Sequence, residues 1–181
     1  MKLVTEISRI KKLSKEKEEE NWGFRSFLKS CGIPTNRIDS ITQKLYKKVS
    51  EKIDCRDCSN CCKEILPILS ENDIEQCTKG LNISAAEFKK KYLEKTDDGR
   101  NTFNKTPCPF LRESRCSIYE FRPSNCRSYP YIGQKGLLSR LISVIHNCSV
   151  CPIVFNVYEY LKSEIWAMDG DEDSDDWEEF I

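Results

Sequence analysis

Apolar side chains recur at helical spacing in two long segments of the chain. Residues 35–53 and 152–168 each carry an apolar residue every three or four positions, which predicts two amphipathic helices. These apolar positions are Ile38, Ile41, Leu45, Val49 and Ile53 in the first segment, and Ile153, Val157, Leu161 and Ile165 in the second. Residues 2–19 carry many charges and only a narrow apolar stripe, and we expect a charged helix there.

Local capping signals predict two shorter helices in the middle of the chain. Ser70 with Asp73 resembles a capping box, and Gly80 supplies a helix stop. Ser84 with Glu87 is a second capping box and opens a predicted helix over 84–93.

Extended structure is expected only in short pieces. Residues 100–118 predict a small hairpin around a turn at 112–115, and the apolar, partly β-branched run 137–145 predicts a strand. Residues 54–62, DCRDCSNCC, predict a knuckle-like loop. The predicted fold is therefore mainly α with minor β, a small irregular domain stapled by a cysteine-ligated metal site.

Length and charge suggest three regions. The 181 residues suit one domain, which we place at 35–168, after an N-terminal helical extension at 1–34. Residues 169–181 contain eight acidic residues and no basic one, and we expect a disordered acidic tail. The N-terminal helix or this tail is a candidate contact for a protein partner.

The composition argues against a membrane or nucleic-acid protein. No run approaches the ~20 apolar residues of a spanning helix, and the first twenty residues lack the apolar core of a signal peptide. We therefore expect a cytoplasmic protein. Lys and Arg are scattered without aromatic residues between them, so we expect no nucleic-acid partner.

Eleven cysteines carry the main chemical signal. An odd number prevents complete pairing in disulfides, and the cytosol keeps thiols reduced, so grouped cysteines indicate metal ligation. Three groups form the candidate ligand set: Cys55, Cys58, Cys61 and Cys62; Cys108, Cys116 and Cys126; and Cys148 and Cys151. Cys31 and Cys77 stand alone, and we interpret both as core residues.

The metal is left open by these spacings. Zinc takes four cysteine or histidine ligands, and nine cysteines suffice for two such sites. A C-x2-C-x2-C run with a remote cysteine before proline is typical of 4Fe–4S ferredoxins, and Cys108 and Cys151 both precede proline. Adjacent residues in an extended chain point apart, so we expect Cys61 and Cys62 not to serve one metal equally. His146, two residues before Cys148, is a weaker candidate ligand.

The order of these motifs resembles the YkgJ-type cysteine-cluster family. The resemblance covers residues 55–151 and rests on C-x2-C-x2-C-C, then C-P-F-L, then C-S-I-Y-E-F-R-P-S-N-C-R-S-Y-P. That family is described as a zinc- or iron-chelating domain, which implies a ligand role for Cys55, Cys58, Cys61, Cys62, Cys108, Cys116 and Cys126. A flagellin lysine methylase is similar to this family, which suggests that the module can serve a methylation system.

Three residues around Cys126 are candidates for contact with the bound group. Arg122 and Arg127 are expected to donate hydrogen bonds to cluster sulfurs or to offset their charge, together with Tyr129. Alternatively, the Arg-Pro and Tyr-Pro steps only shape the chain.

Three functional hypotheses follow. The first is an iron–sulfur or zinc protein acting in electron transfer, metal handling or as an accessory module. The second is a cluster-dependent protein-modifying enzyme, such as a lysine methylase component, although no G-x-G-x-x-G, P-loop or G-x-S-x-G motif is present. The third is a structural zinc module that binds a partner.

Overall fold

The computed structural model describes residues 2–170 and divides the chain into two compact units. Unit 1 combines Met1–Lys52 with Ile132–Ile181, and unit 2 is the intervening segment Ile53–Tyr131. Most of the predicted acidic tail, from residue 171 onward, lies outside the described residues. The fold is mainly α with minor β, as predicted.

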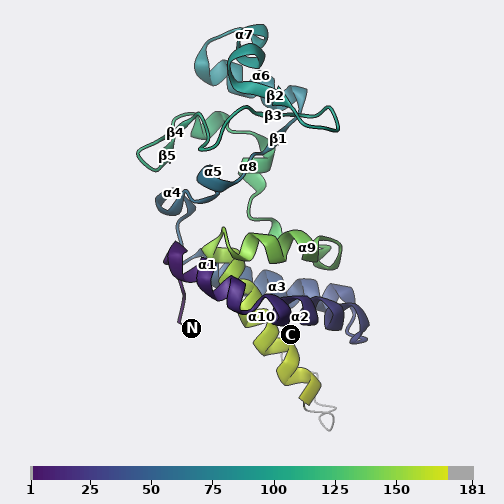
Figure 1. Ribbon diagram of the computed structural model, residues 1–181. Helices are drawn as coiled ribbons and strands as arrows, with labels where there is room; N and C mark the ends of the chain where they lie inside the picture. Colours follow the sequence, from purple (N-terminus) through teal and green to yellow (C-terminus); the bar gives the residue numbers. More distant parts are fainter. Residues whose placement is uncertain (1, 171–181) are drawn as a thin grey trace. The chain divides into compact units, whose positions relative to one another are not determined.

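Unit 1 is a packed set of helices in which α10 is central (Figure 1). Its helices are α1 (Ile7–Glu16), α2 (Glu18–Ser30), α3 (Thr35–Ser50), α9 (Leu137–Cys148) and α10 (Pro152–Gly170), and the short 3-10 helix η2 (Tyr131–Gly133) spans the point where the chain passes from unit 2 to unit 1. The predicted helices over 35–53 and 152–168 are confirmed as α3 and α10. The charged helix expected over 2–19 is confirmed in part as the shorter α1, since residues 2–6 are not helical and α2 begins at Glu18.

Aromatic and polar contacts hold α10 against the N-terminal part of unit 1. The ring of Phe24 packs edge-on against Tyr158, with centroids 5.4 Å apart, and both side chains are fully buried. The Asn156 side chain donates to the Val4 carbonyl at 2.7 Å and accepts from the Val4 amide at 2.9 Å. The extended N-terminal residues are thereby fixed to α10.

The strand expected over 137–145 is wrong, because these residues belong to α9. The buried positions Leu137, Leu141, Val144, Ile145 and Cys148 follow a helical repeat on one face. The start of α9 is fixed from α3, where the Asp39 carboxylate accepts from the amides of Gly136 at 2.7 Å and Leu137 at 3.0 Å.

Unit 2 combines short helices with two small sheets. Its helices are α4 (Cys55–Cys58), α5 (Cys61–Glu64), α6 (Glu71–Leu81), α7 (Ala85–Tyr92), η1 (Tyr119–Phe121) and α8 (Ser124–Ser128). An antiparallel sheet has the order β1 (Ile68–Leu69), β3 (Asn101–Phe103), β2 (Leu93–Lys95), and a hairpin joins β4 (Leu111–Arg112) to β5 (Arg115–Cys116). This hairpin confirms the predicted turn, since Glu113 and Ser114 both adopt positive φ.

The capping signals are confirmed at both middle helices. Ser70 and Asp73 form the reciprocal capping box of α6, and the Ser84 hydroxyl accepts from the Glu87 amide at the start of α7. Gly80 does not end α6, which runs to Leu81 and is capped by Asn82 in the left-handed conformation.

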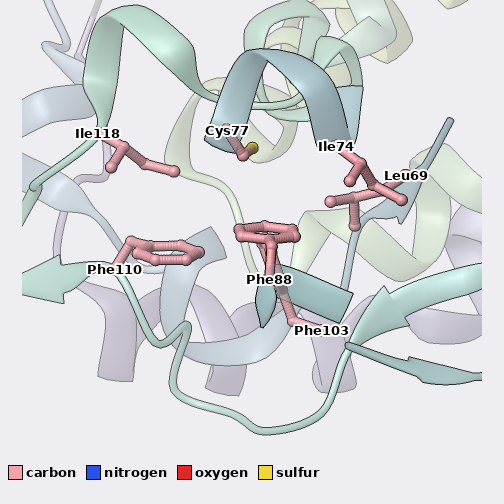
Figure 2. Close-up of a cluster of buried hydrophobic side chains, with 7 residues drawn as sticks. All are labelled: Leu69, Ile74, Cys77, Phe88, Phe103, Phe110 and Ile118. Carbon is pink, nitrogen blue, oxygen red and sulfur yellow. The ribbon is translucent and has the colours of Figure 1, made fainter. Parts of the chain in front are cut away.

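The core of unit 2 is a small apolar cluster with one thiol in it. Figure 2 shows Cys77 of α6 among the apolar side chains of this cluster, in which the rings of Phe88 and Phe110 lie parallel with centroids 6.1 Å apart. Cys77 is fully buried, so its interpretation as a core residue is confirmed. Cys31, at the end of α2, is only half-buried and is not a core residue.

Candidate metal centre

Four of the candidate ligands lie on one tight segment at the start of unit 2. The Asp54 carboxylate caps α4 by accepting from the Arg56 amide at 2.8 Å, which fixes the turn that carries Cys55 and Cys58. Ser59 then adopts the left-handed conformation with φ 47°, and α5 begins at Cys61. The predicted loop therefore consists of two single helical turns joined at Ser59.

The adjacent cysteines of this segment do not lie in an extended chain. Cys61 and Cys62 begin the helical turn α5, and their side chains are hydrogen-bonded to each other. The Cys61 thiol thereby lowers the pKa of Cys62 to about 7, despite burial, which acts in the opposite direction. The assumption of an extended chain at Cys61 and Cys62 is wrong, because the backbone is helical at this point, and the expectation that the two thiols do not serve one metal equally stays a prediction.

The second group of cysteines reaches the same neighbourhood through backbone hydrogen bonds. The Cys108 amide donates to the Cys62 carbonyl at 2.8 Å, which ties the two groups together directly. Cys116 follows on β5, paired in register with Leu111 of β4, and α4 packs against this strand. Segments nearly fifty residues apart in sequence therefore meet at α4, α5 and the hairpin.

Cys126 is delivered by α8, whose start is fixed by an acidic side chain of α6. The Asp73 carboxylate accepts from the Ser124 amide at 2.7 Å and from its hydroxyl at 3.1 Å. The next residue, Asn125, donates through its side chain to the Ile68 carbonyl of β1 at 2.9 Å. α8 is therefore held to both α6 and the small sheet.

The thiols of these segments influence one another electrostatically. Burial, together with smaller contributions from negative charge on Cys108, Cys62, Cys116 and Cys77, raises the pKa of Cys126 to about 12. Burial likewise raises the pKa of Cys108 to about 11, again with contributions from Cys62 and Cys116. Thiols that repel one another as anions are stabilised together only by a cation placed among them.

The predicted arginines lie beside this neighbourhood. Burial raises the pKa values of Cys55 and Cys116, and the positive charge of Arg122 opposes both shifts. The Arg122 guanidinium lies 3.7 Å from the centroid of the Tyr119 ring and donates to the Tyr119 carbonyl at 2.5 Å.

Arg127 and Tyr129 have structural partners of their own. Arg127 donates to the carbonyls of Glu120 and Arg122, each at 3.1 Å, and thereby fastens η1 to α8. Burial raises the pKa of Cys77 to about 12, and the positive charge of Arg127 opposes this shift. The Tyr129 ring packs edge-on against Tyr131, with centroids 6.1 Å apart.

The remaining candidate ligands belong to unit 1. Cys148 ends α9 and is 1% exposed, and Cys151 immediately precedes α10 and is 6% exposed. Burial raises the pKa of Cys148. His146 is exposed, and its ring meets Trp22 edge-on at a centroid distance of 6.3 Å.

The donor set of unit 2 fits a thiophilic metal. All eleven cysteines of the chain carry thiols rather than disulfides, and soft sulfur donors select zinc or iron–sulfur centres over magnesium or calcium. Within residues 2–170, no three Cys, His, Asp or Glu side chains already converge as a group that could hold a metal ion.

Comparison with known families identifies the module. Residues 54–152 match the family model described as "CxxCxxCC: Putative zinc- or iron-chelating domain", which is more than half of the chain. The chain belongs to this family. Membership in the CxxCxxCC family supports metal binding by the chain, and it confirms the cysteine-cluster resemblance found in the sequence. No significant match was found among curated proteins or among solved structures.

The CxxCxxCC match spans all nine cysteines assigned as ligands from the sequence. Among the described helices, none is long and apolar enough to cross a bilayer.

Two residues of the site escaped the sequence analysis. Asp73 was found as a helix cap, but no local signal connects it with Ser124, fifty-one residues away. Ser59 was treated only as a spacer between cysteines, and its buried position follows from the left-handed turn it makes.

Proposed function

We propose that the chain holds an iron–sulfur cluster of the 4Fe–4S kind, or zinc, through cysteine thiolates of unit 2. The proposed ligands come from Cys55, Cys58, Cys61, Cys62, Cys108, Cys116 and Cys126. The observation that carries the proposal is the backbone link between two cysteine segments, in which the Cys108 amide donates to the Cys62 carbonyl at 2.8 Å, together with the half-buried thiols of Cys62, Cys108, Cys116 and Cys126 from four different segments.

Metal binding to this arrangement must displace protons from the thiols. Burial and mutual repulsion keep Cys108 and Cys126 protonated in the metal-free chain, with pKa values of about 11 and 12. Metal binding replaces these protons, so the binding affinity is expected to rise with pH. Arg122, which opposes the shifts at Cys55 and Cys116, would offset part of the negative charge of a thiolate centre.

An iron–sulfur cluster would suit a cytoplasmic electron-transfer, metal-handling or accessory module. The C-x2-C-x2-C run at Cys55, Cys58 and Cys61, with Cys108 before proline, supports iron. Zinc instead would support a structural module, because a closed tetrahedral thiolate site has no open position for a substrate. Cys148 and Cys151 stay predicted ligands.

Elemental analysis of the full chain, purified without oxygen, tests the proposal. Iron with a matching amount of acid-labile sulfide and a broad band near ~400 nm identifies a cluster. Zinc without colour identifies a tetrahedral thiolate site. A chain with neither metal, before or after reconstitution with iron and sulfide or with Zn²⁺, contradicts the proposal.

Matched serine variants assign the ligands. Cys126→Ser and Cys58→Ser are expected to lower the metal content, because each removes a proposed thiolate. Cys77→Ser is the control, since this thiol lies in the apolar core of the same unit and donates to the Phe121 carbonyl at 3.3 Å. Equal metal content in all three variants would exclude the assignment.

A further inference from the structure

Ser59 carries a buried hydroxyl without a hydrogen-bond partner among the described residues. The residue is 5% exposed, and its Oγ makes no hydrogen bond there. A buried hydroxyl that gives up its bonds to water is destabilising unless a partner replaces the water. Such a group in a native site calls for an explanation.

The backbone of Ser59 lies within the cysteine segment. Its amide donates to the Cys55 carbonyl at 3.0 Å, and its carbonyl accepts from the Cys62 amide at 3.0 Å. Ser59 thus joins the turn that carries Cys55 and Cys58 to the turn that carries Cys61 and Cys62. Its left-handed φ of 47° is unusual for a residue other than glycine, asparagine or aspartate.

We propose that the Ser59 hydroxyl donates a hydrogen bond to a metal-bound thiolate of this segment, and this inference rests on the function proposed above. A serine hydroxyl has one proton to donate. The surrounding thiols lose their protons when they bind a metal, after which their sulfurs are only acceptors. The hydroxyl therefore gains its missing partner when the metal binds. Ser59 acts as a positioning residue, because it would act on the metal through a ligand sulfur.

The role predicts opposite effects in the metal-free and metal-bound chain. Ser59→Ala removes an unpartnered buried polar group from the metal-free chain, which is expected to be as stable as the wild type or more stable. The same variant removes a hydrogen bond from the metal-bound chain, and loss of such a bond typically weakens metal binding by about 10- to 100-fold.

Ser14→Ala is the matched control. Its hydroxyl is the other serine hydroxyl found buried without a partner in the described part of the chain, and it lies on α1 of unit 1, away from the cysteine segment in sequence. A second variant, Ser59→Gly, also lacks the hydroxyl but is free of strain at positive φ. An effect common to Ser59→Ala and Ser59→Gly therefore reports the hydroxyl and not the backbone.

The experiment titrates the full chain and its variants with Co²⁺, followed by displacement with Zn²⁺ against a chromogenic chelator. We expect Ser59→Ala and Ser59→Gly to shift the thiolate-to-cobalt charge-transfer band and to bind Zn²⁺ about 10-fold more weakly, while Ser14→Ala matches the wild type. Unchanged band and affinity in both Ser59 variants overturn the role of Ser59 and leave the metal site intact. A wild-type chain without a thiolate-to-cobalt band overturns the proposed thiolate site itself, and the role of Ser59 with it.

Discussion

Replacing Asp73 by asparagine perturbs the junction that holds α8, and with it Cys126. The two carboxylate oxygens accept from the amide of Ser70 at 2.9 Å and its hydroxyl at 2.7 Å, and from the amide of Ser124 at 2.7 Å and its hydroxyl at 3.1 Å. An asparagine offers one acceptor oxygen, and its NH2 group must then face at least one of the two backbone amides.

The expected loss in the free energy of unfolding follows from the hydrogen bonds that asparagine cannot accept. A hydrogen bond to a charged group contributes about 1.5–3 kcal/mol, and a buried amide left without an acceptor costs about 1–3 kcal/mol. We therefore expect Asp73→Asn to lower the free energy of unfolding by roughly 3–5 kcal/mol. That is a large share of the roughly 5–15 kcal/mol that stabilises a typical domain.

Urea denaturation of the metal-free chain measures this loss as a lower midpoint at unchanged slope. Glu71→Gln is the matched control on the same first turn of α6, because Glu71 is exposed and its ion pair with Lys89 at 2.7 Å lies in water. We expect the control to cost less than about 1 kcal/mol. If Asp73→Asn costs no more than Glu71→Gln, the proposed junction does not stabilise unit 2.

The stability difference between the wild type and Asp73→Asn should also depend on pH, which provides a second test. Burial by itself raises the pKa of Asp73, but hydrogen bonds from Ser124 and Ser70 outweigh it, and the net pKa is lowered. A carboxyl whose pKa is lowered by folding stabilises the folded state above its unfolded pKa of about 3.9, and this contribution is lost as the pH falls through the folded value. The stability gap between wild type and Asp73→Asn should therefore narrow below about pH 4, and a constant gap would contradict the cause assigned here.

Three further substitutions test packing and polar contacts in the two units. Gly80→Ala places a Cβ 2.6 Å from the Phe121 ring. Overpacking costs about 1–3 kcal/mol and should outweigh the ~1 kcal/mol gained from the higher helix propensity of alanine, so we expect a lower melting temperature. A higher melting temperature would contradict this contact. Lys162→Met leaves Glu20 and Glu159 without the buried ammonium group that pairs with both. We expect the free energy of unfolding, measured by urea denaturation, to fall by about 3 kcal/mol. An unchanged midpoint would show that these ion pairs do not stabilise unit 1. Asp39→Ala removes the acceptor for the first amides of α9 and should cost about 1–2 kcal/mol, seen as faster hydrogen exchange at Leu137, and unchanged exchange would refute the cap.

Much of the fold follows from local patterns. The regular apolar spacing of α3 and α10 and the caps at Ser70 and Ser84 each depend on residues within one helix, so the sequence predicts them correctly. The α9 segment is different, because its apolar run suits a buried strand and a buried helix equally well. Its helical state is supported by Asp39, which lies almost a hundred residues earlier and has no local signature.

Part of the candidate site also follows from local patterns in the sequence, and the rest depends on tertiary packing. The grouping of the cysteines along the chain predicts a shared ligand set, and within unit 2 the Cys108 amide donates to the Cys62 carbonyl, which links the first two groups. The link from Asp73 to Ser124 depends on tertiary packing and is invisible in the sequence. So is the partition that places Cys148 and Cys151 in a different compact unit.

The interrupted course of unit 1 along the chain would couple the supply of the proposed metal to folding. The polypeptide leaves unit 1 after Lys52 and returns at Ile132, so the helical unit is complete only when α9 and α10 have been synthesised. If residues 53–131 are unstructured, the two parts of unit 1 must close a long loop, at an entropic cost on the order of 4 kcal/mol from its length. A unit 2 folded around its metal fixes the separation of its own ends before that closure. A lack of the metal would then destabilise unit 1, although unit 1 contains no part of the thiolate cluster proposed for unit 2. The newly synthesised chain would also be exposed to proteolysis.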